Sequence, residues 1–227
     1  MKEIKNNQYH PETLSVRAGS EMTEFGENSE ALFLNSSFRF NSAAQAAARF
    51  GGTEPGNIYS RFTNPTVTMF QNKLAALEGA EQCVATSSGM SAILATVMAL
   101  CSAGDHIVSS RSIFGTSTQL FGNILKRWGL DVTFVSQTNP DEWQAAVTPK
   151  TKLFFVETPS NPLTEVCDIQ ALADIAHKAG AHLPCGYLRR TPGTRRTAPL
   201  PDLSPPPPAA LGWRSGRGPG AGRRPWP

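Results

Sequence analysis

Between residues 64 and 182 the apolar positions follow two spacings in turn, one typical of helices and the other typical of strands. Asn64 and Pro65 form a helix-start signal, and Gly79 is placed to end that helix. Short apolar runs predict strands at residues 82–86, 105–109, 131–135 and 152–156, the last one fully buried. Helices are predicted at residues 64–79, 90–101, 116–128, 139–147 and 168–178, of which the second is nearly all apolar and is expected to be buried.

Strands that alternate with helices in this way predict an α/β fold. The connections should be right-handed crossovers, so the sheet should be mostly parallel, with helices on both faces. Ligands of such sheets bind beyond the carboxyl ends of the strands. The segments that follow three of the strands, residues 87–90, 110–116 and 157–161, are therefore the candidates for function.

The two ends of the chain differ from this middle region. Residues 1–63 contain one predicted helix, at 42–50, and otherwise resemble an extended arm without a core of its own, which we expect to pack on a second subunit. Residues 184–227 hold 11 of the 18 prolines, 8 of the 21 basic residues and one acidic residue, a net charge of +7. This composition cannot bury enough apolar surface to fold, so a disordered tail after a boundary near Leu183 is predicted.

Several classes of protein are disfavoured. The chain has no apolar run near the roughly 20 residues that span a membrane, and its polar N-terminus does not resemble a secretory signal. The four cysteines lie far apart and indicate reduced thiols in a cytoplasmic protein. The four histidines lack metal-ligand spacing, so no metal site is predicted and they are interpreted as structural or surface residues. Few aromatic residues lie among the arginines of the tail, which disfavours nucleic-acid binding.

Two segments could bind an anion. Ser88, Gly89 and Met90 lie between a predicted strand and a predicted helix, where free amides and the positive helix end attract phosphate, although an ordinary turn that needs glycine would show the same pattern. Tyr59 and Arg61 lie one residue apart in an extended segment and could contact the same phosphate. Taken alone, the pair is better explained by a solvated arginine and a packing tyrosine.

Two further segments could contact a flat ligand. Phe114 follows a strand, so its ring could stack on such a ligand or, alternatively, join the core. Glu157 and Asn161 follow another predicted strand, in a loop stiffened by two prolines. Polar groups held that firmly at a sheet's carboxyl edge favour a ligand contact.

These motifs together resemble those of the cysteine/methionine-metabolism (transsulfuration) family of pyridoxal-phosphate enzymes, from about Thr13 to His182. The resemblance depends on Tyr59-Ser60-Arg61-Phe62-Thr63-Asn64-Pro65-Thr66, Leu77-Glu78-Gly79-Ala80-Glu81, Ser88-Gly89-Met90-Ser91-Ala92 and Glu157-Thr158-Pro159-Ser160-Asn161-Pro162. Within the family, the O-succinylhomoserine sulfhydrylases are the most similar, on Ala31-Leu32-Phe33, Ala46-Ala47-Ala48-Arg49-Phe50 and Ser110-Arg111-Ser112-Ile113-Phe114-Gly115.

The resemblance implies the large domain of the aspartate aminotransferase-like fold (fold type I), with pyridoxal 5′-phosphate (PLP) as cofactor. It implies that the amides of Gly89 and Met90, beside Ser88, bind the cofactor phosphate. Phe114 would stack on the pyridine ring, and Asn161, supported by Glu157, would bind the phenolic oxygen. Tyr59 and Arg61 would reach the phosphate of a neighbouring subunit, in a homo-oligomer assembled from dimers.

The implied reaction replaces the succinyl ester of a small amino-acid substrate, O-succinylhomoserine, by sulfide and gives homocysteine. Cystathionine γ-synthase and a methionine γ-lyase-like enzyme remain alternatives, although relatives of the lyase type carry a tyrosine where this chain has Phe114. A non-catalytic pseudoenzyme or partner subunit is an alternative of another class.

One part of the family pattern is missing. The family's aspartate for the ring nitrogen, in Val-Asp-Asn, and its Schiff-base lysine, in Ser-x-Thr-Lys, do not occur, and Lys178 is the last lysine. Read one base later, the codons of Cys185-Gly186-Tyr187 permit Val-Asp-Thr, so we hypothesise a frame shift from about Pro184. The alternative is a genuine basic tail. We therefore expect an inactive, truncated chain that aggregates readily, with an unfinished sheet edge after Leu183.

Overall fold

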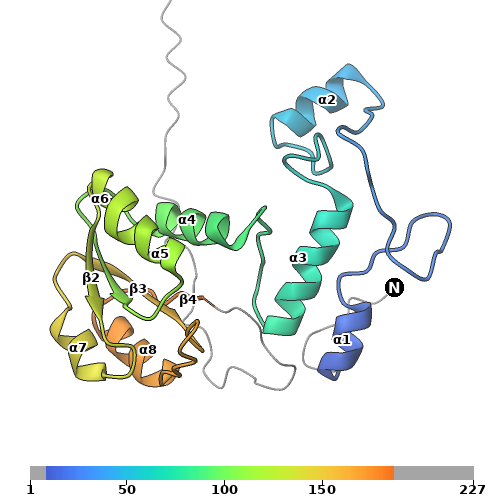
Figure 1. The fold of residues 1–227 in the computed structure, drawn as a ribbon. Coiled ribbons are helices and arrows are strands. Elements are labelled where there is room, and N and C mark those ends of the chain that lie inside the picture. The colour runs from blue at the N-terminus through green and yellow to red at the C-terminus, as the bar shows by residue number, and fades with distance from the viewer. Residues whose placement is uncertain (1–8, 187–227) are drawn as a thin grey trace, which may run out of the picture. The chain divides into compact units, whose positions relative to one another are not determined.

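The computed structural model describes residues 9–186 (Figure 1). Its helices are α1 (Pro11–Arg17), α2 (Ala43–Phe50), α3 (Pro65–Glu78), α4 (Gly89–Leu100), α5 (Gly115–Gln119), a π-helical turn η1 (Leu120–Ile124), α6 (Leu125–Arg127), α7 (Pro140–Ala145) and α8 (Ile169–Lys178). Its strands are β1 (His106–Ser110), β2 (Asp131–Val135), β3 (Thr151–Glu157) and β4 (Cys185–Gly186). From β1 onward, helices alternate with strands as the apolar pattern predicted.

The four described strands form one parallel sheet in the order β2-β1-β3-β4. Successive residues of a central strand face opposite sides of the sheet, so Ile107 and Val108 enter different cores. On one face, Ile107 packs in a buried cluster with residues of α4, η1 and α6. On the other face, Val108 packs with residues of α7 and α8, including Trp143 and Leu172. Helices therefore cover both faces, as predicted (Figure 1).

Helix ends follow the local signals in the sequence. The Asn64 side chain accepts a hydrogen bond from the Thr66 amide and begins α3, and Gly79, with φ of 67°, ends it in the left-handed conformation. In the same way, the Asp168 side chain accepts from the Ala171 amide and begins α8. These boundaries match the predicted ones because caps and left-handed glycines are local properties of the chain.

Two of the predicted elements differ in the structure. Residues 82–86 form no strand, because the Ala85 amide donates to the Gln71 side chain at 2.8 Å and no described strand pairs with the segment. Val84 there is 80% exposed. Helix α4 forms as predicted, but Val97 is its one buried residue, so the prediction of a buried helix was wrong. Among the described residues, α4 packs through Val97 into the cluster that also contains residues of η1 and α6.

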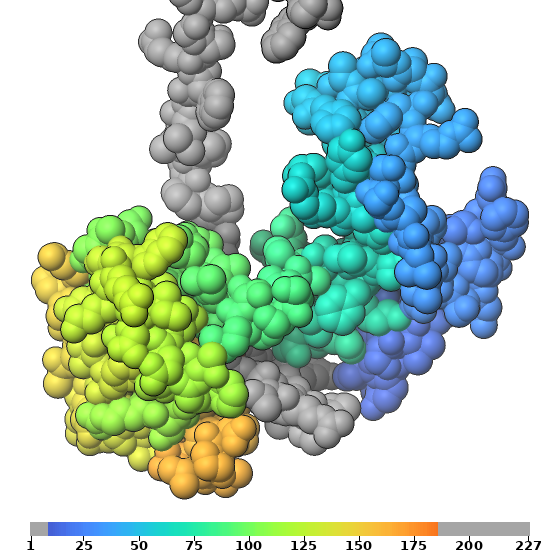
Figure 2. All heavy atoms as spheres, turned by 45° about the horizontal axis from the view of Figure 1, so that its top comes forward, coloured from blue at the N-terminus to red at the C-terminus, as the bar shows by residue number. Residues whose placement is uncertain are grey.

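The N-terminal region is less extended than predicted. Pro11–Arg17 forms helix α1, which contacts α3 and buries Leu14. Just after α1 the backbone at Gly19 runs so close to α3 that a Cβ there would lie 2.7 Å from the Met69 carbonyl oxygen. No residue of α2 is buried, and Figure 2 shows its side chains, in light blue, at the surface.

The sheet continues past residue 183, contrary to our prediction. Cys185 and Gly186 pair in parallel with Val156 and Glu157 at the carboxyl end of β3. Strand pairing uses backbone groups alone, so it does not depend on which side chains follow Pro184. The predicted disordered tail lies outside the described residues, apart from its first three. Within residues 9–186, no helix is long and apolar enough to cross a membrane.

Candidate functional site

The turn before α4 contains backbone donors that the helix itself does not use. Ser88 caps the helix, since its hydroxyl oxygen accepts from the Ser91 amide at 3.2 Å. Helix geometry leaves the amides of Gly89 and Met90, in the first turn, without a partner inside the helix. A Cβ built on Gly89 would meet no atom within 4 Å, so a phosphate has room to approach those amides. The three residues that the sequence singled out therefore fit an anion at this helix start.

Glu157 connects the end of β3 to the segment that carries Phe114. One carboxylate oxygen accepts from the Phe114 amide at 2.8 Å, and the other accepts from the Ser117 hydroxyl at 3.0 Å. The Ser117 oxygen also lies 3.9 Å from the sulfur of Met90. Glu157 is buried, and its carboxylate caps the start of α5, where Phe114 itself provides no side-chain cap. It thereby links the end of β3 to the segment of Phe114 and, through Ser117, to Met90. Sequence reasoning did not identify Ser117 as part of this connection.

Phe114 does not join the core, which was the alternative interpretation of this residue. Its side chain is 44% exposed, while its amide is fixed by Glu157 at the carboxyl edge of the sheet. An exposed ring with a fixed backbone can stack on a flat ligand without a large loss of conformational freedom. Of the two interpretations, packing in the core is therefore wrong, and the contact with a flat ligand stays a prediction.

Asn161 lies exposed in the turn that follows β3. The Ser160 amide donates to the Glu165 carbonyl at 2.9 Å, and the Thr164 amide donates to the Ser160 carbonyl at 2.8 Å. These bonds close the chain around Asn161, and both proline peptide bonds of the loop are cis. Asn161 lies in a hydrogen-bonded turn after β3, at the same edge of the sheet as Phe114, which follows the neighbouring parallel strand β1.

Tyr59 and Arg61 belong to a different part of the chain. They line a shallow hollow of about 350 Å³ together with Ser36 and Ser60. Tyr59 packs edge-on against Phe50, and the Arg61 guanidinium lies 5.0 Å from the ring centre of its neighbour Phe62. These contacts stay within the N-terminal region, so the structure does not join this pair to the amides of Gly89 and Met90.

None of the lysines that the structure describes lies at the carboxyl edge of the sheet. Lys150 and Lys152 flank the amino end of β3, and Lys73 is paired with Glu30. Lys126 and Lys178 lie in the last turns of α6 and α8. Within residues 9–186, no group of three or more histidine, cysteine, aspartate or glutamate side chains could hold a metal ion.

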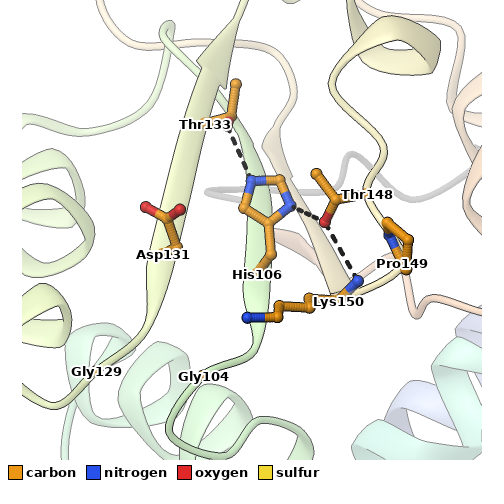
Figure 3. Close-up of a pocket in the computed structure, with 8 residues that line it drawn as sticks. All are labelled: Gly104, His106, Gly129, Asp131, Thr133, Thr148, Pro149 and Lys150. Atoms are coloured by element: carbon orange, nitrogen blue, oxygen red, sulfur yellow. Dashed lines mark hydrogen bonds between the residues drawn. The ribbon is translucent and has the colours of Figure 1, made fainter.

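The opposite edge of the sheet has a second hollow, of about 490 Å³, whose lining residues are shown in Figure 3. Its buried member is His106, whose ring nitrogens lie 2.8 Å from the Thr151 hydroxyl and 2.9 Å from the Thr133 hydroxyl. Burial holds the pKa of His106 below its ordinary value, although the carboxylate of Asp131 opposes this shift. Both ring nitrogens are used to join β1 to β2 and β3, so we interpret His106 as structural, as the sequence indicated.

A parallel sheet with helices on both faces, with a helix start that an anion can approach and with an exposed ring and an amide beyond the ends of its strands, is the arrangement expected of a PLP-dependent enzyme of the aspartate aminotransferase-like fold. The sequence profile of the family described as Cys/Met metabolism PLP-dependent enzyme matches residues 12–185. The chain belongs to this family, whose cofactor is the one that the sequence predicted.

Curated relatives support the same assignment. Over 189 residues the chain is 56% identical to O-succinylhomoserine sulfhydrylase of Pseudomonas aeruginosa, covering 83% of this chain and 47% of that protein. It is 42% identical over 174 residues to O-acetyl-L-homoserine sulfhydrylase of Corynebacterium glutamicum, covering 76% of this chain and 40% of the relative. L-methionine gamma-lyase of Treponema denticola is 40% identical over 169 residues, which cover 74% of this chain and 41% of that protein. The chain thus spans about half the length of the curated relatives it matches.

Solved structures agree with the fold. MetB from Corynebacterium glutamicum superposes with a TM-score of 0.74 at 31% identity, covering 80% of this chain and 46% of that one. An O-acetylhomoserine (thiol)-lyase structure from Campylobacter jejuni, which contains a pyridoxyl-lysine monophosphate, gives the same TM-score and identity. The match covers 78% of this chain and 44% of that one. The predicted fold class and family are confirmed.

Proposed function

We propose that this chain carries the phosphate- and ring-binding residues of a transsulfuration enzyme that acts on O-succinylhomoserine. The observation that carries the proposal is the 56% identity to an O-succinylhomoserine sulfhydrylase. At the site, Gly89 and Met90 would donate their amides to the phosphate beside Ser88, and Phe114 would stack on the ring. Asn161 would donate to the phenolic oxygen, and Glu157 would hold Phe114 in place through the bond to its amide.

The proposed reaction breaks the bond from Cγ of O-succinylhomoserine to the succinyl oxygen and forms a bond from Cγ to sulfide, giving homocysteine and succinate. When bound, PLP supplies the electron sink that such chemistry at an amino acid needs. Phe114 has no hydroxyl, so it can hold the ring but cannot hold or transfer a proton. This favours a sulfhydrylase over a lyase of the methionine γ-lyase type, to which the chain is 40% identical.

We further propose a homo-oligomer built from dimers, in which Tyr59 and Arg61 contact the cofactor phosphate of a second subunit. The N-terminal region exposes large apolar side chains that a second copy would cover, including Leu32 and Leu34. Replacing Arg61 with alanine should weaken PLP binding and shift the protein toward monomer. Arg39→Ala, an exposed arginine of the same region, is the matched control.

We propose that the chain as written binds PLP without turning over, because no lysine follows Lys178. In this proposal a frame shift from about Pro184 replaces the segment that carries the Schiff-base lysine in the family. A non-catalytic partner subunit is the second candidate. If the sequence after residue 184 is genuine, the amides at the start of α4 could still bind the cofactor phosphate although the chain lacks the Schiff-base lysine. A cytoplasmic location remains our prediction, because the four cysteines lie far apart in the sequence and show no paired spacing.

Two experiments test the proposal. Resequencing the gene across the codons of residues 181–187 decides whether one base restores the family pattern. Purified chain is then incubated with PLP, dialysed, and reduced with borohydride before peptide mapping. We expect PLP to bind reversibly without one dominant labelled lysine. A single labelled lysine would overturn the proposal of an inactive chain, and absence of PLP binding would overturn the proposed site. Restored protein should form homocysteine from O-succinylhomoserine and sulfide faster than from the O-acetyl ester.

A further inference from the structure

Buried polar groups hold the turn that carries Asn161. Besides the bonds that close the turn, the Glu165 amide donates to the Ser160 hydroxyl oxygen at 3.0 Å. Thr164 has a φ of 54°, a left-handed conformation that is costly for a β-branched residue and persists only where neighbours enforce it. Neighbours from the segments after β1 and β2 contact Glu165, the residue that follows Thr164.

The first of these neighbours is Gln137, which follows β2 and is 2% exposed. Its amide nitrogen donates to the Glu165 carbonyl at 2.8 Å, and its amide oxygen accepts from the Ser110 hydroxyl at 2.9 Å. Ser110 also accepts from the Ser112 amide, so its single proton is available for Gln137. This pattern fixes the orientation of the Gln137 amide, with its NH₂ group toward the turn. One buried side chain therefore connects the end of β1 with the turn after β3.

A second contact runs beside the first. The Glu165 carboxylate accepts a hydrogen bond from the Ser112 hydroxyl. Ser112 lies two residues before Phe114 on the same segment, and the amide of Phe114 is held by Glu157. The turn that carries Asn161 and the segment that carries Phe114 are therefore joined through Glu165 and Gln137, at the edge where the cofactor ring would lie.

We propose that Gln137 is a positioning residue that sets the place of Asn161 relative to Phe114, so that one residue meets the phenolic oxygen while the other covers the ring. The inference rests on the proposed function. Gln137 itself is buried beneath the loops and acts through the Glu165 carbonyl. Its loss should affect the cofactor contact of Asn161 and leave the phosphate contact at Gly89 in place.

The test measures binding of 4′-deoxypyridoxine 5′-phosphate by the purified chain in equilibrium dialysis. This probe keeps the ring, the phosphate and the phenolic oxygen, and its methyl group in place of the aldehyde cannot react with lysines. Asn161→Ala should weaken binding about tenfold, as expected for loss of one hydrogen bond in a desolvated site. Gln137→Met keeps the side-chain volume, removes both hydrogen bonds and should weaken binding by a similar factor. Gln144→Met, on an exposed glutamine of α7, is the matched control and should bind normally.

The double variant separates positioning from general destabilisation. If Gln137 acts through Asn161, then Gln137→Met with Asn161→Ala should bind no more weakly than Asn161→Ala alone. Additive losses, or normal binding by Gln137→Met, would overturn the inference while the site itself stands. Absence of probe binding by the unaltered chain would overturn both the inference and the proposed site. If Gln137→Met does not fold, Ser112→Ala, which removes only the second contact, should show the same non-additivity at smaller size, and additivity there would overturn the inference.

Discussion

Replacing Glu157 with alanine should destabilise the protein by about 2–3 kcal/mol. The carboxylate accepts from the Phe114 amide at 2.8 Å and from the Ser117 hydroxyl at 3.0 Å, and the side chain is buried. A hydrogen bond to a charged group contributes about 1.5–3 kcal/mol, and a buried donor left without a partner costs about as much. Relief from burying a carboxylate offsets part of this loss, and the Ser117 hydroxyl can turn toward the Met90 sulfur 3.9 Å away. The unpaired amide of Phe114 therefore dominates the expected change.

Urea unfolding followed by circular dichroism measures this change directly. Glu157→Gln should cost only about 1 kcal/mol, because its amide oxygen can still accept from Phe114 while its NH₂ group donates to Ser117. Glu54→Ala is the control, since Glu54 forms an ion pair with Arg49 near the surface and should contribute less than about 1 kcal/mol. Equal losses for Glu157→Ala and Glu157→Gln would refute the reasoning, as would a loss for Glu157→Ala no larger than that of the control.

Three further predictions concern pH, the phosphate turn and the start of α3. Because burial holds the pKa of His106 below its ordinary value of about 6.5, the folded state binds fewer protons than the unfolded state. Stability should therefore fall as pH drops through about 6.5, and urea midpoints of His106→Gln should show a shallower pH dependence. Gly89→Ala should raise the melting temperature slightly, since alanine favours a helix by up to about 1 kcal/mol, yet it should weaken PLP binding several-fold in dialysis because the added Cβ occupies the space in front of the Gly89 and Met90 amides. A variant that bound PLP normally would contradict the proposed phosphate site at this helix start. Asn64→Ala removes the cap of α3 and two hydrogen bonds that Asn64 donates, to the Phe33 carbonyl and the Ser60 hydroxyl. Thermal unfolding should therefore show that the free energy of unfolding falls by about 2 kcal/mol, and a fall below about 0.5 kcal/mol would contradict this.

The sequence predicted those parts of the fold that depend on local spacing. Strands β1, β2 and β3 and the ends of α3 and α8 lie where apolar runs, caps and glycines placed them. The prediction failed for residues 82–86, whose apolar composition does not say whether a neighbouring strand will be available for pairing. Helix α1 was missed because its seven residues carry one buried side chain, Leu14, and no periodic pattern.

The candidate site was predictable where a residue type stands at a recognisable place, and not where it depends on tertiary packing. Gly89 and Phe114 follow the loops expected to bear function, and the structure leaves both accessible. Gln137 and Glu165 resemble ordinary loop residues in the sequence. Only the fold shows that one buried amide and one carbonyl meet 2.8 Å apart. The sequence did show polar residues after the predicted strands, which indicated that hydrogen bonds could form there. Spacing alone could not show which of these residues bond to one another.

The position of β1 between β2 and β3 has a consequence for synthesis of the protein on the ribosome. All hydrogen-bonded pairs between these three strands come from the continuous stretch 106–157. The pairs join residues 25 to 46 positions apart, and the entropy cost of closing a loop grows only slowly with its length. We expect this three-stranded segment to assemble as soon as residue 157 has left the exit tunnel. A reading-frame error downstream of residue 184 would then act on a nascent chain whose central sheet is already formed, with α8 and β4 still to be added.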